Sequence, residues 1–298
     1  MNAHSRPHRD SVFVEEAEVL AHQPYDGRQF IMKLQAPKIA RDARPGSFVH
    51  VRCDLQRPMR RPLSIMRCDR QKGWIELLYR VFGEGTALLS QHKVGSHINL
   101  MGPIGTPFTL HPERPRPLLL GGGVGIPPMI FIADEARKQK GGFRPMVLMG
   151  SETPFPFKTR PSQIIIPGLP DGTIAAMPLM EDWGIPSRLA SQQAFPGVYQ
   201  GYITELARTW LNTLDDGQRS EVELFACGPH PMLEAVAEVA DEFDLPCQLS
   251  LEEFMACAIG GCAGCVVKVH NSDGSSAMKR VCVDGPVFPA EAIFPRTG

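Results

Sequence analysis

The chain has 298 residues, of which 43% are hydrophobic, and a formal net charge of −1 from 31 basic and 32 acidic side chains. This length predicts about two domains with packed cores, and the balanced charge argues against a surface for nucleic acid or anionic membrane. No apolar run approaches the roughly 18 residues of a transmembrane helix, and the polar N-terminus carries no secretory signal, so we expect a cytoplasmic protein.

Short segments between residues 11 and 111 are apolar or alternate in polarity, and turns separate them. Segments of this length and spacing predict a small antiparallel β-barrel. The expected strands are Val12–Leu20, Phe30–Leu34, Phe48–Val51, Trp74–Val81 and Ile98–Met101.

Two segments that interrupt the strand pattern predict a bound flavin. Arg61-Pro62-Leu63-Ser64 follows Arg60 and a loop, so it places two cations beside a hydroxyl donor, which suits a pyrophosphate and a ring heteroatom. Gly85 and Thr86 open a predicted helix whose free N–H groups can bind phosphate. Between these segments, Leu78-Tyr79-Arg80 offers a tyrosine able to stack on a ring. The alternative is a pair of solvated arginines and an ordinary helix start.

A glycine turn follows the proline-rich linker at residues 112–117. Leu118–Leu120 reads as a buried strand, Gly121-Gly122-Gly123-Val124-Gly125 as the turn, and Ile126 as the start of a helix. Strand, glycine turn and helix form the dinucleotide-binding unit, with phosphates at the helix N-terminus. The sequence departs from G-x-G-x-x-G at Pro128, and a tight turn without a ligand is the alternative.

Later strands and helices alternate, which predicts a parallel sheet. Pro145–Met149 and Val222–Ala226 read as strands, and the helix after the second buries Met232, Val236, Val239 and Phe243. Cys227-Gly228-Pro229 then lies at the carboxyl end of a strand, where such sheets bind ligands. Cys227 itself is expected to be a buried thiol and not a nucleophile. The proline-rich region Phe155–Gly197 shows no clear pattern.

Cysteines near the end of the chain have the spacing of an iron–sulfur site. Cys257, Cys262 and Cys265 form C-x4-C-x2-C, and Cys282 follows at a distance. This is the plant-type [2Fe–2S] arrangement, in which four thiolates hold two irons. The intervening Gly260, Gly261 and Gly264 permit unusual backbone angles and close approach of N–H groups to sulfur. A structural zinc site and disulfides are the alternatives, although zinc sites usually pair their cysteines more closely.

In this order, the motifs resemble those of the ferredoxin–NADP reductase superfamily. The cysteine motif, with Val281–Phe288 after it, resembles the electron-transfer subunit of class 1B dihydroorotate dehydrogenase. The resemblance implies an oxidoreductase subunit of pyrimidine biosynthesis that binds FAD and a [2Fe–2S] cluster and uses NAD as co-substrate. Its expected partner is an FMN-containing catalytic subunit, in a hetero-oligomer of two plus two. Electrons from dihydroorotate would pass by the cluster and FAD to NAD.

By motif, the resemblance assigns Arg61, Pro62, Leu63, Ser64, Leu78, Tyr79, Arg80, Gly85 and Thr86 to FAD. The iron ligands would be Cys257, Cys262, Cys265 and Cys282. Nucleotide contacts are expected from Gly121, Gly122, Gly123, Gly125, Cys227, Gly228 and Pro229. The expected domains are a flavin-binding barrel at 11–111, an α/β nucleotide-binding domain at 115–246 and a cluster domain at 247–298.

The sequence also allows other electron acceptors and other functions. Gly150–Phe155 and Met180–Pro186 depart from the usual family pattern, which leaves NAD, NADP or another acceptor. The rival functions are an NAD(P)H:ferredoxin-type reductase or hydrogenase diaphorase subunit of the same superfamily, and a non-catalytic metal-binding scaffold. The sequence contains no convincing general acid–base pair or nucleophile, which is consistent with a chain whose chemistry resides in its cofactors.

Overall fold

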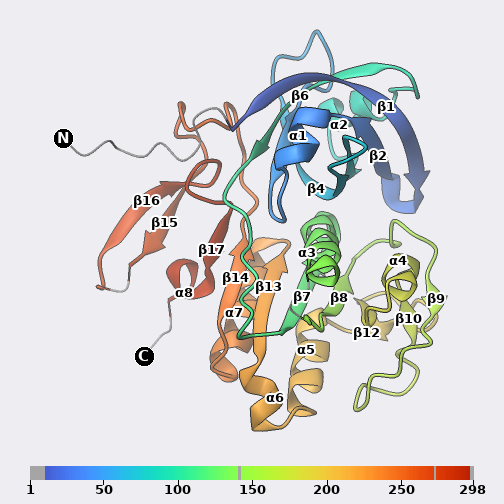
Figure 1. Cartoon of the computed structure of the whole chain (residues 1–298), viewed down its shortest axis with the longest axis vertical. Helices are drawn as coiled ribbons and strands as arrows, with labels where there is room; N and C mark the ends of the chain where they lie inside the picture. Colours follow the sequence, from blue (N-terminus) through green and yellow to red (C-terminus); the bar gives the residue numbers. More distant parts are fainter. Residues whose placement is uncertain (1–10, 140–141, 272, 296–298) are drawn as a thin grey trace.

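The structure is a computed structural model that describes residues 11–139, 142–271 and 273–295. A β-barrel lies above a twisted central sheet, and the C-terminal segment lies at their side (Figure 1). This arrangement confirms the expected fold class. No helix within the described part of the chain is long and apolar enough to cross a membrane.

Six antiparallel strands close the barrel in the order β1-β2-β5-β4-β3-β6. They are β1 (Phe13–Tyr25), β2 (Gln29–Gln35), β3 (Phe48–Val51), β4 (Arg61–Asp69), β5 (Trp74–Arg80) and β6 (His97–Ile104). The short helices are η1 (Asp26–Arg28), α1 (Pro37–Asp42) and α2 (Glu84–Leu89). Alternate residues of the strands point inward, so that Val49 and Val51 of β3 meet Ile75 and Leu77 of β5 in the barrel core.

The segment Arg61–Ser64 corrects the sequence prediction, because it forms the first half of β4 and does not interrupt the strands. It pairs with β3 from Val51↔Arg61 to Phe48↔Ser64. Pro62 argues against a strand in the sequence, because proline has no N–H to donate to a neighbouring strand. It is tolerated here because this half of β4 has a neighbour on one side only.

Seven strands form the central sheet in the order β12-β11-β8-β7-β13-β14-β17. They are β7 (Arg116–Gly122), β8 (Met146–Gly150), β11 (Ser187–Ser191), β12 (Tyr199–Gln200), β13 (Val222–Cys227), β14 (Cys247–Ser250) and β17 (Val287–Pro289). All neighbours are parallel, as predicted, except that β17 runs antiparallel to β14. The sheet therefore continues beyond residue 246 into the segment expected to hold the cluster.

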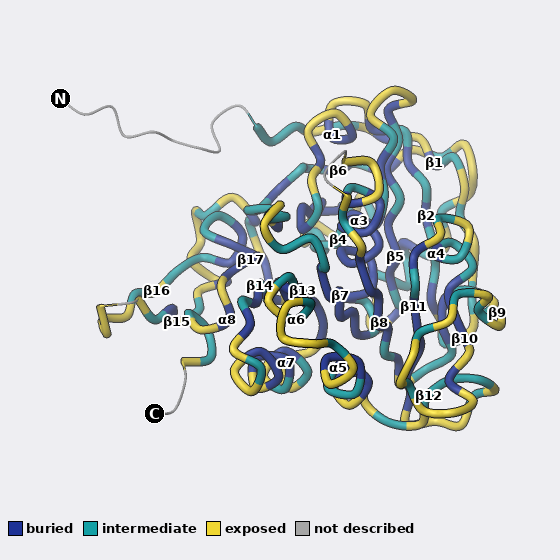
Figure 2. Tube along the Cα trace, turned by 60° about the horizontal axis from the view of Figure 1, so that its bottom comes forward, coloured by how far each residue is buried: buried dark blue, intermediate teal, exposed yellow. Residues whose placement is uncertain are grey.

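Helices cover both faces of the sheet (Figure 2). They are α3 (Ile126–Lys138), α5 (Ile203–Asn212), α6 (Asp216–Ser220) and α7 (His230–Glu242). The α3 helix packs between the sheet and the barrel, in one core with Met66 of β4 and Leu78 of β5. Val236 and Val239 of α7 are fully buried on the other face, as their spacing predicts, whereas Met232 and Phe243 are only partly buried.

The region that lacks a sequence pattern, Phe155–Gly197, contains a buried cation, Arg188. It contains β9 (Arg160–Pro161), β10 (Ala175–Ala176) and α4 (Pro178–Asp182), in addition to β11. Arg188 of β11 is 5% exposed and donates hydrogen bonds to the carbonyl oxygens of Thr173, Ser187 and Ile164. Through its several N–H donors, the guanidinium therefore connects the main chain at Ile164 and Thr173 to β11.

The C-terminal segment contains a hairpin and a short helix. These are β15 (Val266–His270), β16 (Ser276–Arg280) and α8 (Ala290–Ile293). The chain after β16 returns to the barrel, where the amide of Thr106 donates to the carbonyl of Gly285 and Thr106 forms a bridge with Pro286.

We expect Phe225→Ala to lower the free energy of unfolding by about 3–5 kcal/mol, because Phe225 of β13 is 1% exposed between α3 and Phe108 and a cavity would remain. Leu55→Ala is the control, since this side chain is 80% exposed and its removal should change stability by less than about 0.5 kcal/mol. Urea denaturation followed by circular dichroism measures both values. Equal effects of the two substitutions would contradict the assignment of Phe225 to the core.

Candidate functional site

The ladder between β4 and β5 ends partway along the closed barrel, and we call the unpaired stretch between the two strands the opening. Their pairing runs from Asp69↔Trp74 to Ile65↔Leu77 and does not continue among the described residues. Beyond it, Arg61–Ser64 pairs with β3 and Leu78–Arg80 pairs with β2. The two strand segments predicted to contact flavin therefore line opposite sides of one opening. Among the described residues, the two segments have no ladder partner on this side, although Leu78 and Tyr79 are only 2% and 1% exposed.

Arg61 joins this opening to the start of α2. A Cβ atom on Gly85 would lie 3.3 Å from the guanidinium of Arg61, so glycine lets the cation approach the helix closely. The guanidinium donates to the carbonyls of Met59 and Arg60, and no described carboxylate forms a salt bridge with it. A cation without a paired carboxylate, beside a helix start, suits a phosphate group.

Arg60 has a different role from the one expected. Its guanidinium donates to the carbonyl oxygens of His50 and Asn99 at 3.0 and 3.2 Å, and to the side chain of Asn99. These bonds tie the start of β4 to β3 and β6. The prediction that both arginines face a pyrophosphate is therefore corrected, because the guanidinium of Arg60 is already held by the barrel.

The hydroxyls of Ser64 and Thr86 also differ. Ser64 is half-buried, and its hydroxyl has no hydrogen-bond partner among the described residues, so it remains able to bind a ligand. Thr86 instead holds its own turn, because its Oγ1 accepts from the amides of Phe82 and Gly83 at 3.0 and 3.3 Å. We expect Thr86 to shape the α2 turn, with ligand contact left to the main chain.

The ring of Tyr79 is not available for stacking on a ligand, which corrects the sequence interpretation. Tyr79 is 1% exposed and stacks on Phe30, with ring centroids 5.4 Å apart. Its hydroxyl lies 2.8 Å from Nε2 of His22. The alternation of β5 turns Tyr79 into the barrel core and Leu78 toward α3, so this segment can offer its main chain to the opening.

The glycine turn between β7 and α3 forms as predicted, with a 3-10 turn η2 (Gly123–Gly125) before the helix. Most of its glycines are explained by close packing of the chain. A Cβ atom on Gly125 would lie 2.2 Å from the carbonyl oxygen of Cys227, and one on Gly122 would lie 2.3 Å from Sδ of Met232. Gly121 is equally crowded, with Cα of Ile126 at 2.9 Å.

Gly123 is the exception, with a φ of +53° and open surroundings. The η2 turn also contacts β5, so the glycine turn lies beside the strand that lines the barrel opening. Cys227-Gly228-Pro229 ends β13 next to it, as predicted for this edge of the sheet. Cys227 is 1% exposed, as expected for a buried thiol, and burial raises the pKa of this thiol.

The four predicted iron ligands lie in two pairs at the C-terminal segment. The side chain of Cys257 interacts with that of Cys262, and the side chain of Cys265 with that of Cys282. All four are free thiols: Cys265 and Cys282 are buried, Cys257 is partly buried, and Cys262 is exposed. Two thiolates for each iron is the ligand set of a [2Fe–2S] cluster. Among the described residues, no group of three or more histidine, cysteine, aspartate or glutamate side chains is placed to hold a metal ion.

Main-chain N–H groups point at the cysteine sulfurs of this loop. The amide of Cys262 donates to Sγ of Cys257, and the amide of Gly264 to Sγ of Cys262, each at 3.4 Å. Burial raises the pKa of Cys257, but N–H groups outweigh it and lower that pKa to about 7. Burial and Cys265 raise the pKa of Cys282 to about 12, so a metal would have to hold this thiolate.

The backbone of the loop turns sharply, although not only at its glycines. The left-handed residues are Ala258, Gly260 and Ala263, with φ of +56°, +78° and +52°. Gly261 and Gly264 do not have positive φ, so the role predicted for them as turn formers is corrected. A Cβ on Gly264 would lie 3.4 Å from Sγ of Cys262, which is an ordinary van der Waals contact. Paired thiols and inward N–H groups fit a cluster.

The sequence interpretation missed the contribution of β3 to this region. Phe48 belongs to the same buried core as Met255, Cys265 and Cys282, so this barrel strand shares a core with the thiol-bearing loop. All four residues of β3 are buried, so the strand is covered on both faces, which its sequence Phe48–Val51 alone does not reveal.

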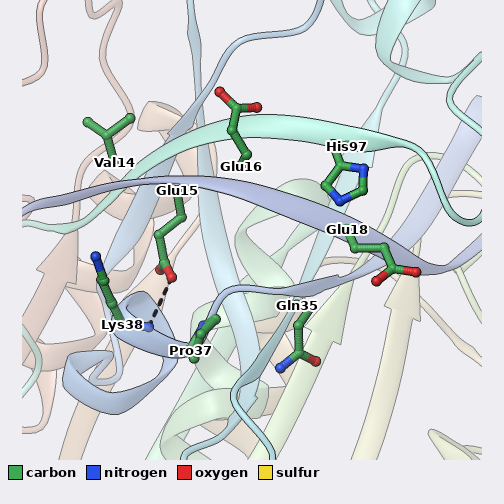
Figure 3. A pocket seen from close by; sticks show the side chains of 8 residues that line it. All are labelled: Val14, Glu15, Glu16, Glu18, Gln35, Pro37, Lys38 and His97. Carbon is green, nitrogen blue, oxygen red and sulfur yellow. Dashed lines mark hydrogen bonds between the residues drawn. The ribbon is translucent and has the colours of Figure 1, made fainter.

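A shallow hollow of about 430 Å³ on the outer face of the barrel lies apart from these motifs (Figure 3). Glu15, Glu16 and Glu18 line it, and the carboxylate of Glu15 accepts from the amide of Lys38. Three carboxylates give this surface the wrong sign for a dinucleotide, so we assign no cofactor to it.

Two family models match the chain. The "oxidoreductase FAD-binding domain" matches residues 13–108, and the "iron-sulfur cluster binding domain of dihydroorotate dehydrogenase B" matches residues 252–294. The first match covers the barrel with its opening, and the second includes all four cysteines.

Curated relatives match over almost their full length. The NAD(+)-dependent dihydroorotate dehydrogenase B electron transfer subunit of Desulforamulus reducens is 35% identical, over 93% of this chain and 97% of the relative. That of Bacillus caldolyticus is 32% identical, over 96% and 98%. Among solved structures, an NADH-dependent reduced ferredoxin–NADP oxidoreductase is similar with a TM-score of 0.74 and 24% identity, covering 94% of this chain and 90% of that one. At this identity the structural likeness supports the fold alone.

We expect Gly125→Ala to destabilise the chain by about 1–3 kcal/mol, because the added methyl group would collide with the Cys227 carbonyl and push the β7 and β13 turns apart. Gly123→Asn is the control, since asparagine tolerates a left-handed φ and nothing lies within 4 Å of the new Cβ. Melting temperatures of the two variants compare the effects. Equal stability of both variants would show that the turns are not packed as described.

Proposed function

The chain belongs to the family of dihydroorotate dehydrogenase B electron transfer subunits, and on this premise we propose that it carries electrons between a dihydroorotate-oxidising catalytic subunit and NAD. The electrons would pass through a [2Fe–2S] cluster held by Cys257, Cys262, Cys265 and Cys282, and through FAD bound at the barrel opening. The name of the relatives implies a catalytic partner subunit. We further propose that this partner contains FMN and assembles with the chain as two plus two.

The observation that carries this proposal is the packing of a paired-thiol loop against the barrel strand that neighbours the flavin opening. Phe48 of β3 contacts the core that includes Cys265 and Cys282. The same strand pairs with Arg61–Ser64, which forms one side of the opening. Strand β3 therefore connects the two places, since it shares a core with the thiols and pairs with one side of the opening.

The chain's own residues would bind and orient the flavin. Arg61 offers a cation without a carboxylate partner, and the hydroxyl of Ser64 is unengaged among the described residues. We assign Arg61 to the pyrophosphate and Ser64 to the flavin ring. Pro62 and Leu63, with Leu78–Arg80 across the opening, would contribute main-chain contacts and exclude water.

Flavin chemistry supplies the conversion between single electrons and hydride, because a flavin can hold one or two electrons and nicotinamide takes two. The residues of the cysteine loop would tune the reduction potential of the cluster, which exchanges single electrons with the flavin. The N–H groups of Cys262 and Gly264 point at sulfur, and such hydrogen bonds affect the reduction potential of a cluster. No residue of this chain is required as a general acid or a nucleophile.

NAD is proposed to bind at the edge of the sheet where the β7 and β13 turns meet. The open Gly123 and the exposed Pro229 lie at this edge, and η2 contacts β5 of the barrel. A nicotinamide nucleotide here would reach the barrel opening from the side of the sheet. The crowded Gly121, Gly122, Gly125 and Gly228 would keep the two turns close, and direct ligand contact would come from the open positions.

The direct test is an anaerobic titration of the purified complex with dihydroorotate, followed by addition of NAD. We expect dihydroorotate to bleach the flavin absorption and NAD to restore it, with FMN and FAD both present. Reduction by NADH without any response to dihydroorotate, or co-purification with a ferredoxin or hydrogenase partner, would favour another member of the superfamily. A colourless protein that contains zinc would support a non-catalytic scaffold.

We expect Cys262→Ser to abolish the visible absorption of the cluster while FAD remains bound, because this exposed thiol holds iron and does not support the core. Cys68→Ala is the control, since Cys68 is buried in the barrel and is not a predicted ligand. Iron analysis and the visible spectrum of each variant give the result. Full iron content in Cys262→Ser would overturn the ligand assignment.

Arg61→Ala should weaken FAD binding by about tenfold to a hundredfold, which corresponds to the loss of a hydrogen bond to a charged group worth about 1.5–3 kcal/mol. Arg41→Ala serves as the control because Arg41 is exposed and pairs with its neighbour Asp42. Flavin fluorescence during reconstitution of the apoprotein measures both dissociation constants. An unchanged constant for Arg61→Ala would place the pyrophosphate elsewhere.

A further inference from the structure

His50 lies where the barrel meets the segment that leads into the cluster loop. It is 0% exposed and lies in β3, whose residues alternate between the barrel core and the core outside the barrel. Val49 and Val51 point into the barrel core, so His50 points out of the barrel on the same side as Phe48. Phe48 packs in one core with Met255, two residues before Cys257. The imidazole lies near the main chain of Met255, just before the thiol-bearing loop.

Both ring nitrogens of His50 lack a hydrogen-bond partner of ordinary geometry among the described residues. Main-chain groups of Met255 and Arg60 nevertheless lie near enough to interact with the ring. Burial and, next, the cation of Arg60 lower the pKa of His50 to about 4, so the ring is neutral near neutral pH. A neutral imidazole can donate at one nitrogen only and must accept at the other.

The two main-chain groups beside this ring each precede a candidate cofactor site in the sequence, because Met255 lies two residues before Cys257. Arg60 directly precedes Arg61, and its guanidinium donates to the carbonyl oxygen of His50 at 3.0 Å. His50 also pairs with Pro62 of β4. A shift of this side chain would therefore move the loop before Cys257 relative to the flavin-facing half of β4. A buried polar ring is normally hydrogen-bonded, and the main-chain groups of Met255 and Arg60 are the ones that lie beside this ring.

We propose that His50 is a positioning residue that ties the main chain at Met255 to the main chain at Arg60 and so sets the separation between cluster and flavin. The inference rests on the proposed function, since it concerns a step in which the cluster and the flavin exchange one electron, one being oxidised as the other is reduced. Electron transfer between fixed centres slows steeply as their separation grows. Replacement of the ring by an apolar one should therefore slow this step even when both cofactors are bound.

The experiment uses the holo complex with His50→Phe, which keeps a ring of similar size, and His50→Gln, which restores a donor and an acceptor. The matched control is His92→Phe. His92 is a barrel histidine whose Nε2 lies 3.1 Å from the carbonyl oxygen of Cys53, and whose own carbonyl accepts from His22. NADH reduces each protein, and rapid freeze-quench electron paramagnetic resonance records the spectrum of the reduced cluster and its rate of appearance.

We expect His50→Phe to retain iron and FAD, to shift the g-values of the cluster and to slow its reduction by about tenfold, because a small displacement of reacting centres has a large effect on rate. His50→Gln should recover most of the rate, and His92→Phe should change neither spectrum nor rate. Wild-type spectrum and rate in His50→Phe would overturn the proposal. So would an effect of His92→Phe as large as that of His50→Phe.

If His50→Phe loses a cofactor, His50→Gln decides the question. Wild-type spectrum and rate in His50→Gln would support the hydrogen-bonding role, whereas the same loss in both variants would reduce His50 to a packing residue and contradict the proposal. The two proposals fail differently. A wild-type complex that does not respond to dihydroorotate would refute the proposed function, while reduction by NADH would still test His50.

Discussion

The contact between the C-terminal segment and the end of the barrel is the constraint on which the rest of this structure depends. A Cβ atom on Gly105 would lie 2.4 Å from Cδ of Pro286, so the two segments meet at a distance that only glycine allows. The bridge between Thr106 and Pro286 continues this contact. Because Pro286 follows Cys282 by four residues, the contact brings the fourth thiol to the barrel.

The cores around this contact explain why three functional elements can meet in one chain. Phe48 and Ile104 of the barrel share a core with Cys265 and Cys282, so the thiol loop has an apolar floor and needs little secondary structure of its own. On the other side, α3 fills the space between the barrel and the sheet and carries the glycine turn to β5. Each core is completed by residues from two segments that lie far apart in the sequence.

Much of this organisation could be predicted from local patterns. The apolar run at Leu118–Leu120, the glycine turn after it and the prolines of α3 specify strand, turn and helix within a few residues of each other. The close spacing of Cys257, Cys262 and Cys265 likewise places three of the predicted ligands in one loop. These signals are local, and the structure places the elements as the patterns indicate.

Other features could not be predicted, because they depend on the environment of a side chain and not on its spacing. Tyr79 reads as a possible stacking ring, yet its position in β5 turns it into the barrel core. Arg60 and Arg61 are adjacent and look equivalent, but β3 and β6 hold the first and leave the second available. A lone histidine such as His50 has no motif at all, and its burial becomes visible only when the C-terminal segment covers β3.

The central claim is that a two-iron cluster and a flavin bind to one chain on the two sides of β3 and β4 and exchange electrons there. The most direct measurement is the cofactor and spin content of the anaerobically purified chain after reduction with NADH. The account predicts about two iron atoms and one FAD for each chain, with bleached flavin absorption and a [2Fe–2S] spin signal close to one per chain. Flavin bleaching without a cluster signal, or a chain that contains neither iron nor flavin, would contradict it.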